Sequence, residues 1–338
     1  MNAKKTEPAP IEDLGFIKGQ GLTPRIFHGR WLLFASFKAP SMKPTVKQPE
    51  QISEKREVIM IPKRCLSCFL VGIGLLISAC TSMEAVQKYA EYTRLTIEGV
   101  KPVAEDFYAS CMRANSAKPL ANYNKCEMEQ KASQAILMMS NVLDEYGMAL
   151  GALAADELVN YDKDIDTLRQ EIMNLKVKGI EGEKVTAIGS LAKFIAKAAT
   201  SAYQQKQVAM FITESNDSVV IVANTLADVI RQNYSQAIEL EISSWEDTYK
   251  RVERVTRNEK PLEWESYSKV QWQTRVELER KLKVAGLLAK SIKKIGITHT
   301  KLKKDANNLT SKEIVAVVSS FVNDVKPVIK DLQKAFSK

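Results

Sequence analysis

The stretch LERKLKVAGLLAKSIKKIGITHTKL, residues 278–302, decides the fold. Its apolar residues recur at steps of three and four, which places their side chains on one face of an α-helix. The same spacing continues through most of the chain after residue 80, and no segment there has the period-two alternation of a strand. The pattern therefore predicts an all-α protein. The seam of this helix consists of Leu278, Leu282, Ala285, Leu288, Ile292, Ile295, His299 and Leu302.

Turn and capping residues divide the periodic sequence into about five to six long helices. Gly179 and Gly182 interrupt one helical pattern, and Pro261 suits the first position of another. Ser215-Asn216-Asp217 offers an N-cap, and Thr310-Ser311-Lys312-Glu313 matches a capping box. The expected helices cover 82–112, 128–153 with a continuation or new start at 162–175, 183–212, 215–255, 261–302 and 310–332.

Helices of this length predict an elongated antiparallel bundle. A helix of about 40 residues spans roughly 60 Å at ~1.5 Å per residue. Trp245 and Trp272 are almost equally distant from the turn at 258–261, so an antiparallel hairpin brings them to the same level. The segment 183–212 is rich in alanine, which lets neighbouring helices approach closely, and we expect it to be the central helix.

A second stretch, MIPKRCLSCFLVGIGLLISAC at residues 60–80, has a different character. Lys63 and Arg64 precede a short apolar run, and small residues follow, as in a secretory signal. The rival interpretation is a transmembrane helix. The run from Leu66 to Ala79 has 14 residues and spans roughly 21 Å, short of the ~30 Å hydrocarbon core. The length therefore favours a signal peptide.

The tetrapeptide Ile77-Ser78-Ala79-Cys80 resembles the lipobox of bacterial lipoproteins. The resemblance implies cleavage before Cys80, which then carries a diacylglycerol and an N-acyl lipid. Because Thr81 and Ser82 follow instead of aspartate, the resemblance implies sorting to the outer membrane, with the protein facing the periplasm. The membrane is then a partner through the lipid, and the domains are a signal peptide at 60–79 and a helical bundle at 80–338.

Residues 1–59 precede this signal, whereas secretory signals stand at the N-terminus. The segment contains six prolines and only one short apolar cluster, Trp31–Ala35, so we expect it to be disordered. One interpretation is a start site assigned too early, with Met60 as the true first residue. The other is a cytoplasmic tail on a signal anchor.

Composition argues against a nucleic-acid partner. The net charge of +9 includes residues 1–79, which hold 12 Lys and Arg and 6 Asp and Glu of the 49 and 40 in the chain. The mature chain would keep 37 basic and 34 acidic residues, close to neutrality. A nearly neutral chain outside the cytoplasm is not expected to bind nucleic acid.

The five cysteines fall into three groups. Cys65 and Cys68 lie inside the signal, and Cys80 is the lipidation residue. Cys111 and Cys126 remain, and an oxidising compartment favours a disulfide between them, around a turn-rich loop. The alternative is a pair of reduced, buried thiols.

No motif of the mature chain indicates an enzyme, a metal site or a bound cofactor. His299 is its only histidine and lies on a helical seam, where a packed core residue is expected. Two Ser-x-x-Lys matches, beginning at Ser190 and Ser291, lack the companion motifs that give this pattern its meaning. The acidic run at 162–166 fails the EF-hand pattern because Thr167 and Met173 stand at the required glycine and glutamate positions.

Charge is distributed unevenly along the mature chain. Ten basic and two acidic residues lie between Arg275 and Lys304, and eight acidic and two basic residues lie between Asp144 and Glu171. The basic block is a candidate face for anionic partners, and pairing of the two blocks or plain solvation is the structural alternative. The candidate face consists of Arg280, Lys283, Lys290, Lys293, Lys294 and Lys301.

These features predict a lipid-anchored helical binding or structural module of the bacterial cell envelope. Its partner would be an envelope protein or the cell wall. The alternative is a membrane-active, pore-forming-like helical protein with Ala187–Ala202 as the inserting segment, which Lys193 and Lys197 make costly. An enzyme without a recognisable motif ranks third.

Overall fold

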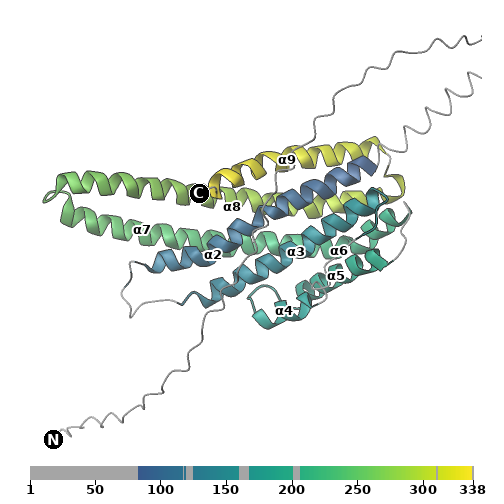
Figure 1. Ribbon diagram of the computed structural model, residues 1–338, viewed down its shortest axis with the longest axis horizontal. Helices are drawn as coiled ribbons and strands as arrows, with labels where there is room; N and C mark the ends of the chain where they lie inside the picture. The colour runs from purple at the N-terminus through teal and green to yellow at the C-terminus, as the bar shows by residue number, and fades with distance from the viewer. Residues whose placement is uncertain are drawn as a thin grey trace, which may run out of the picture. The chain divides into compact units, whose positions relative to one another are not determined.

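The computed structural model describes residues 83–116, 118, 125–159, 167–200, 206–309 and 311–336. These residues form an all-α, elongated antiparallel bundle, and no strand occurs among them (Figure 1). The chain forms a helix at 83–98, followed by α2 (Val100–Asn115), α3 (Glu127–Ala154), α4 (Leu168–Leu175), α5 (Glu183–Thr200), α6 (Lys206–Val229), the π-helix η3 (Ile230–Tyr234), α7 (Ser235–Thr256), α8 (Pro261–Lys304), the 3-10 turn η4 (Ala306–Asn308) and α9 (Lys312–Phe336).

The seam of residues 278–302 forms the buried side of α8, as the spacing predicted. Ala285, Leu288, Ile292, Ile295 and Leu302 have no exposed surface. With 44 residues, α8 is roughly 66 Å long at ~1.5 Å per residue. It packs against α6, α7 and α9, so it contacts three other long helices.

The central helix is α6, and not the alanine-rich helix α5 as expected. Helix α6 packs against α3, α5 and α8. It approaches α8 closely at Gly296, where an added Cβ would lie 3.3 Å from the Cα atom of Val220. Glycine permits this approach because it has no side chain to separate the two backbones.

The expected N-cap at Ser215-Asn216-Asp217 is wrong. These residues lie inside α6, which begins at Lys206, and Ser215 and Asn216 are buried. Ser215 donates a hydrogen bond to the carbonyl oxygen of Phe211 at 2.6 Å. Polar side chains can occupy a helix interior when buried groups supply their partners.

Other helix ends follow the sequence signals more closely. Pro261 is the first residue of α8, and Gly179 and Gly182 have positive φ in the turns before α5. Ser311 provides the cap of α9, because its Oγ accepts a hydrogen bond from the backbone N–H of Ile314 at 3.2 Å. The first helical segment is interrupted at Gly99, so the expected helix 82–112 forms two helices.

An interruption of another kind lies between α6 and α7. The π-helix η3 joins them without a break in the helical path, so residues 206–256 form one long helical segment. A single π turn inside an α-helix contains one extra residue and is frequent at functional sites. Tyr234, the last residue of η3, is buried.

Candidate functional site

The predicted lipidation residue, Cys80, lies outside the described residues, as do the rest of the signal and residues 1–59. Among the described helices, none is both long enough and apolar enough to cross a membrane. The first described residue, Met83, begins a helix three residues after Cys80.

Cys111 and Cys126 form the predicted disulfide, which joins the C-terminal end of α2 to the start of α3. Their Cα atoms are 6.0 Å apart, and both side chains are buried. Glu129 lies near the two sulfur atoms, but the disulfide occupies both thiols that a metal ion would need as thiolates. The function of this pair is therefore to hold the two helices together.

The candidate basic face divides into two groups. Lys293 pairs with Asp228 at 2.8 Å, and Lys294 pairs with Asp324. The other four residues of the face are exposed on α8 and form no ion pair with another described residue. They are Arg280, Lys283, Lys290 and Lys301. No ion pair between described residues joins this block to the acidic block at 144–171. Three acids of that block, Asp162, Asp164 and Asp166, lie outside the described residues.

A cluster of charges ties α2 to α7 and α8. Arg113 contacts Glu241 through Nε at 2.5 Å and Asp106 at 2.9 Å, and Lys281 contacts Asp106 at 2.8 Å. Tyr234, in the π-helix, donates to Asp106 at 2.8 Å. Burial would raise the pKa of Asp106, but the hydrogen bond from Lys281 and the charge of Arg113 outweigh burial and lower it. Asp106 therefore stays ionised beside Arg113 and Lys281.

A chain of hydrogen bonds crosses the core of the bundle. Asn216 donates through Nδ2 to Asp217, so its Oδ1 is free to accept from Nδ1 of His299 at 3.0 Å. Nε2 of His299 then accepts from the hydroxyl of Tyr146 at 2.5 Å. Burial, with a smaller contribution from the charge of Lys303, lowers the pKa of His299 to about 3. His299 is a packed, neutral core residue, as its place on the seam predicted.

Residues 242–277 form a two-helix hairpin beyond the main bundle, which we call the arm (Figure 1). It comprises the second half of α7 and the first half of α8, and none of its side chains is fully buried. Aromatic rings take the place of a core. Trp245 stacks on Tyr249 with ring centroids 5.1 Å apart and lies edge-on to Trp272 at 5.9 Å, which confirms the predicted level of the two tryptophans.

The arm also exposes apolar side chains. Leu262 is 81% exposed, Trp272 is 54% exposed and Val276 is 49% exposed. With Lys269 they follow steps of seven, three and four, so they lie on one stripe of α8. Among the described residues, no third helix packs on this stripe. The arm therefore has the spacing of a helix-binding surface without a resolved occupant.

The helix at 83–98 and the arm lie at opposite ends of the described bundle. The helix at 83–98 and α2 run roughly in line, and α7 lies beside α2 (Figure 1). Contacts of Asp106 with Tyr234 and of Ala114 with Ser244 show that α2 and α7 run parallel. Met83 to Ala114 spans roughly 47 Å, and Ser244 to Arg257 adds about 20 Å at ~1.5 Å per residue. The arm tip thus lies about 65 Å from Met83.

Comparisons with known proteins found no matching family model, no similar curated protein and no similar solved structure. The structure itself therefore defines the class to which the protein belongs, an all-α bundle with a disulfide and a projecting two-helix arm.

The arm was only partly predictable from the sequence. The hairpin around Pro261 and the two tryptophans indicated two antiparallel helices, but not that the remaining helices end short of them. The signal for exposure was the composition of 250–270, where charged residues outnumber aliphatic ones. The basic residues Lys250, Arg251 and Arg254 on the arm half of α7 were also missed, because the strongest charge bias in the sequence lies on α8.

Proposed function

We infer that this protein is a lipid-anchored helical module that faces the periplasm and presents its arm to a partner in the bacterial envelope. The sequence Ile77-Ser78-Ala79-Cys80 supports the anchor through its resemblance to a lipobox. The single observation that carries the proposal is the separation of the anchor end from the arm.

A lipid on Cys80 would hold the helix that begins at Met83 close to the membrane, because only two residues separate them. The arm tip, about 65 Å away along the bundle, would then project from the membrane. The disulfide between Cys111 and Cys126 fits the same location, since disulfides persist in oxidising compartments.

The partner that best fits the arm is an amphipathic helix of another envelope protein. The stripe of Leu262, Lys269, Trp272 and Val276 has the three-four spacing with which helices pack together. Glu265 and Arg280 lie on the same side of α8, so the stripe carries both charges. Mixed charge suits a protein helix better than a uniformly anionic polymer.

The anchor is tested by mass spectrometry of the native protein purified from bacterial membranes. We expect an N-terminal peptide that begins at a triacylated Cys80. A Cys80→Ser variant should lose the modification and leave the outer-membrane fraction. An unmodified Cys80 in a chain that retains Met1 would contradict the proposal and favour the cytoplasmic-tail interpretation.

The arm is tested by photo-crosslinking in living cells. A photoreactive residue at position 262 should give one reproducible adduct with an envelope protein, and the same residue at Val315 of α9, 41% exposed, is the matched control. A Trp272→Glu substitution should abolish the adduct while the circular dichroism spectrum remains helical. Equal capture from both positions, or capture that survives Trp272→Glu, would reject the arm as the binding surface.

A further inference from the structure

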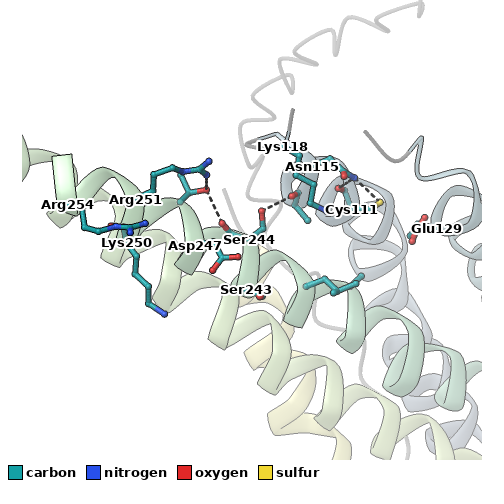
Figure 2. A pocket seen from close by; sticks show the side chains of 14 residues that line it. Cys111, Asn115, Lys118, Glu129, Ser243, Ser244, Asp247, Lys250, Arg251 and Arg254 are labelled. Atoms are coloured by element: carbon teal, nitrogen blue, oxygen red, sulfur yellow. Dashed lines mark hydrogen bonds between the residues drawn. The ribbon is translucent and has the colours of Figure 1, made fainter. Parts of the chain in front are cut away.

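A hollow of about 570 Å³ lies between the C-terminal end of α2 and helix α7 and extends along the arm as far as Arg254 (Figure 2). Its size is within the range of small-molecule sites. Polar and basic side chains supply much of its lining, chiefly those of Lys118, Ser243, Thr248, Lys250, Arg251 and Arg254.

The two arginines of this hollow differ from the other two arginines on the arm. Arg257 pairs with Glu253 at 2.9 Å, and Arg275 pairs with Glu279 at 3.0 Å. By contrast, the guanidinium groups of Arg251 and Arg254 form no ion pair with any described carboxylate, although Nε of Arg254 donates to the carbonyl oxygen of Lys250 at 3.4 Å. Lys250, which also lines the hollow, lies 3.9 Å from Glu246. The unneutralised guanidinium groups of α7's second half therefore gather at the hollow.

Hydrogen bonds hold the wall of the hollow in place. Ser244 donates to the carbonyl oxygen of Ala114 at 2.7 Å, which fixes α7 against the end of α2. Thr248 donates to the carbonyl oxygen of Ser244 at 2.9 Å and accepts from Nη2 of Arg251 at 3.3 Å. Because Arg251 is oriented before any ligand arrives, less conformational entropy is lost on binding.

Two acids, Asp247 and Glu129, line the same hollow. The lining thus holds four basic and two acidic side chains, which favours a small anion over a long polyanion. Guanidinium groups form forked hydrogen bonds with phosphate oxygens, and carboxylates accept hydrogen bonds from sugar hydroxyl groups.

We propose that this hollow binds a phosphate ester that also carries hydroxyl groups, such as a sugar phosphate. Arg251 and Arg254 contact the phosphate, and Asp247 with Ser243 contacts the hydroxyl groups. The phosphosugar can be a free molecule or part of a lipid headgroup. The site is independent of the lipid on Cys80 and of the arm's stripe, so failure of either leaves it intact.

Isothermal titration calorimetry on the full-length chain tests the site. Glucose 6-phosphate should bind and glucose should not. The Arg251→Gln/Arg254→Gln variant should weaken binding at least about tenfold, which corresponds to about 1.4 kcal/mol. The control is Lys326→Gln/Lys330→Gln, which removes the same charge from exposed positions on α9 and should change affinity less than about twofold.

Vesicles that contain phosphatidylinositol 4-phosphate distinguish the two sources of the ligand. Sedimentation with these vesicles, lost in Arg251→Gln/Arg254→Gln, without binding of glucose 6-phosphate would assign the site to a lipid headgroup. Binding of the soluble ester would assign it to free phosphosugars. Absence of both, or equal losses in the two double variants, would overturn the proposal, because binding would then reflect net charge alone.

Discussion

The buried imidazole of His299 predicts a loss of stability in mild acid. Its side chain has no exposed surface, and burial lowers its pKa to about 3 from the ordinary value of 6.5. The unfolded chain therefore takes up a proton near pH 6.5, whereas the folded chain does not until about pH 3. Stability is fully present above pH 6.5 and falls as the pH decreases through this interval.

The size of the effect follows from the two pKa values. Between pH 7.5 and pH 5, His299 should reduce the free energy of unfolding by about 2 kcal/mol, with a limiting slope of ~1.4 kcal/mol per pH unit. Urea denaturation followed by circular dichroism at several pH values measures this loss. A His299→Gln variant is the matched control, because glutamine can accept from Tyr146 and donate to Asn216 without titrating.

Between pH 7.5 and pH 5, we expect the free energy of unfolding of the wild type to fall by about 2 kcal/mol more than that of His299→Gln. Subtraction of the two curves removes the contributions of carboxylates and of His28. Parallel curves would refute the reasoning. So would an NMR titration in which His299 of the folded wild type takes up a proton near pH 6.5, a measurement that does not depend on the variant.

Three further predictions concern stability. Replacing Cys111 and Cys126 with serine should lower the free energy of unfolding by about 3 kcal/mol, measured in urea against the oxidised wild type, because the disulfide closes a loop with a sequence separation of 15. Gly286→Ala should stabilise the protein by about 0.5–1 kcal/mol, since open space surrounds its new Cβ, whereas Gly296→Ala should not, because its Cβ meets the backbone of α6. An equal gain in melting temperature at both glycines would contradict this packing. Arg113→Ala should lower the free energy of unfolding by about 2 kcal/mol or more in the same assay, because it leaves the buried carboxylate of Glu241 without its partner. A loss below about 0.5 kcal/mol would show that the charge cluster is dispensable for stability.

Much of the fold was predictable because helical spacing is a local signal. The seam on α8 is buried where the three-four steps place it. The break before α5 contains Gly179 and Gly182, both with positive φ. Ser215 and Asn216 misled the prediction, because a capping residue and a buried polar partner are the same residue types. Which of the two applies depends on a contact with His299, 83 residues after Asn216.

The candidate sites were less accessible to sequence reasoning. Cys111 and Cys126 could be paired because the expected signal accounts for the other three cysteines, which leaves these two as the remaining pair. The neutralisation of Lys293 and Lys294 could not be predicted, since their partners come from α6 and α9. The hollow beside Arg251 depends on how α7 lies beside the end of α2, which periodicity does not encode.

The π-helix at Ile230–Tyr234 has a consequence for the direction in which the arm faces. One extra residue in a continuous helix turns everything after it by about 100°, since an α-helix has ~3.6 residues per turn. Deleting a single residue there would rotate α7 about the helix axis relative to α6. Trp245 would then turn away from Trp272, while the packing of α6 in the bundle would remain unchanged. The direction in which the side chains of α7 face within the arm therefore depends on the one extra residue of the π-helix.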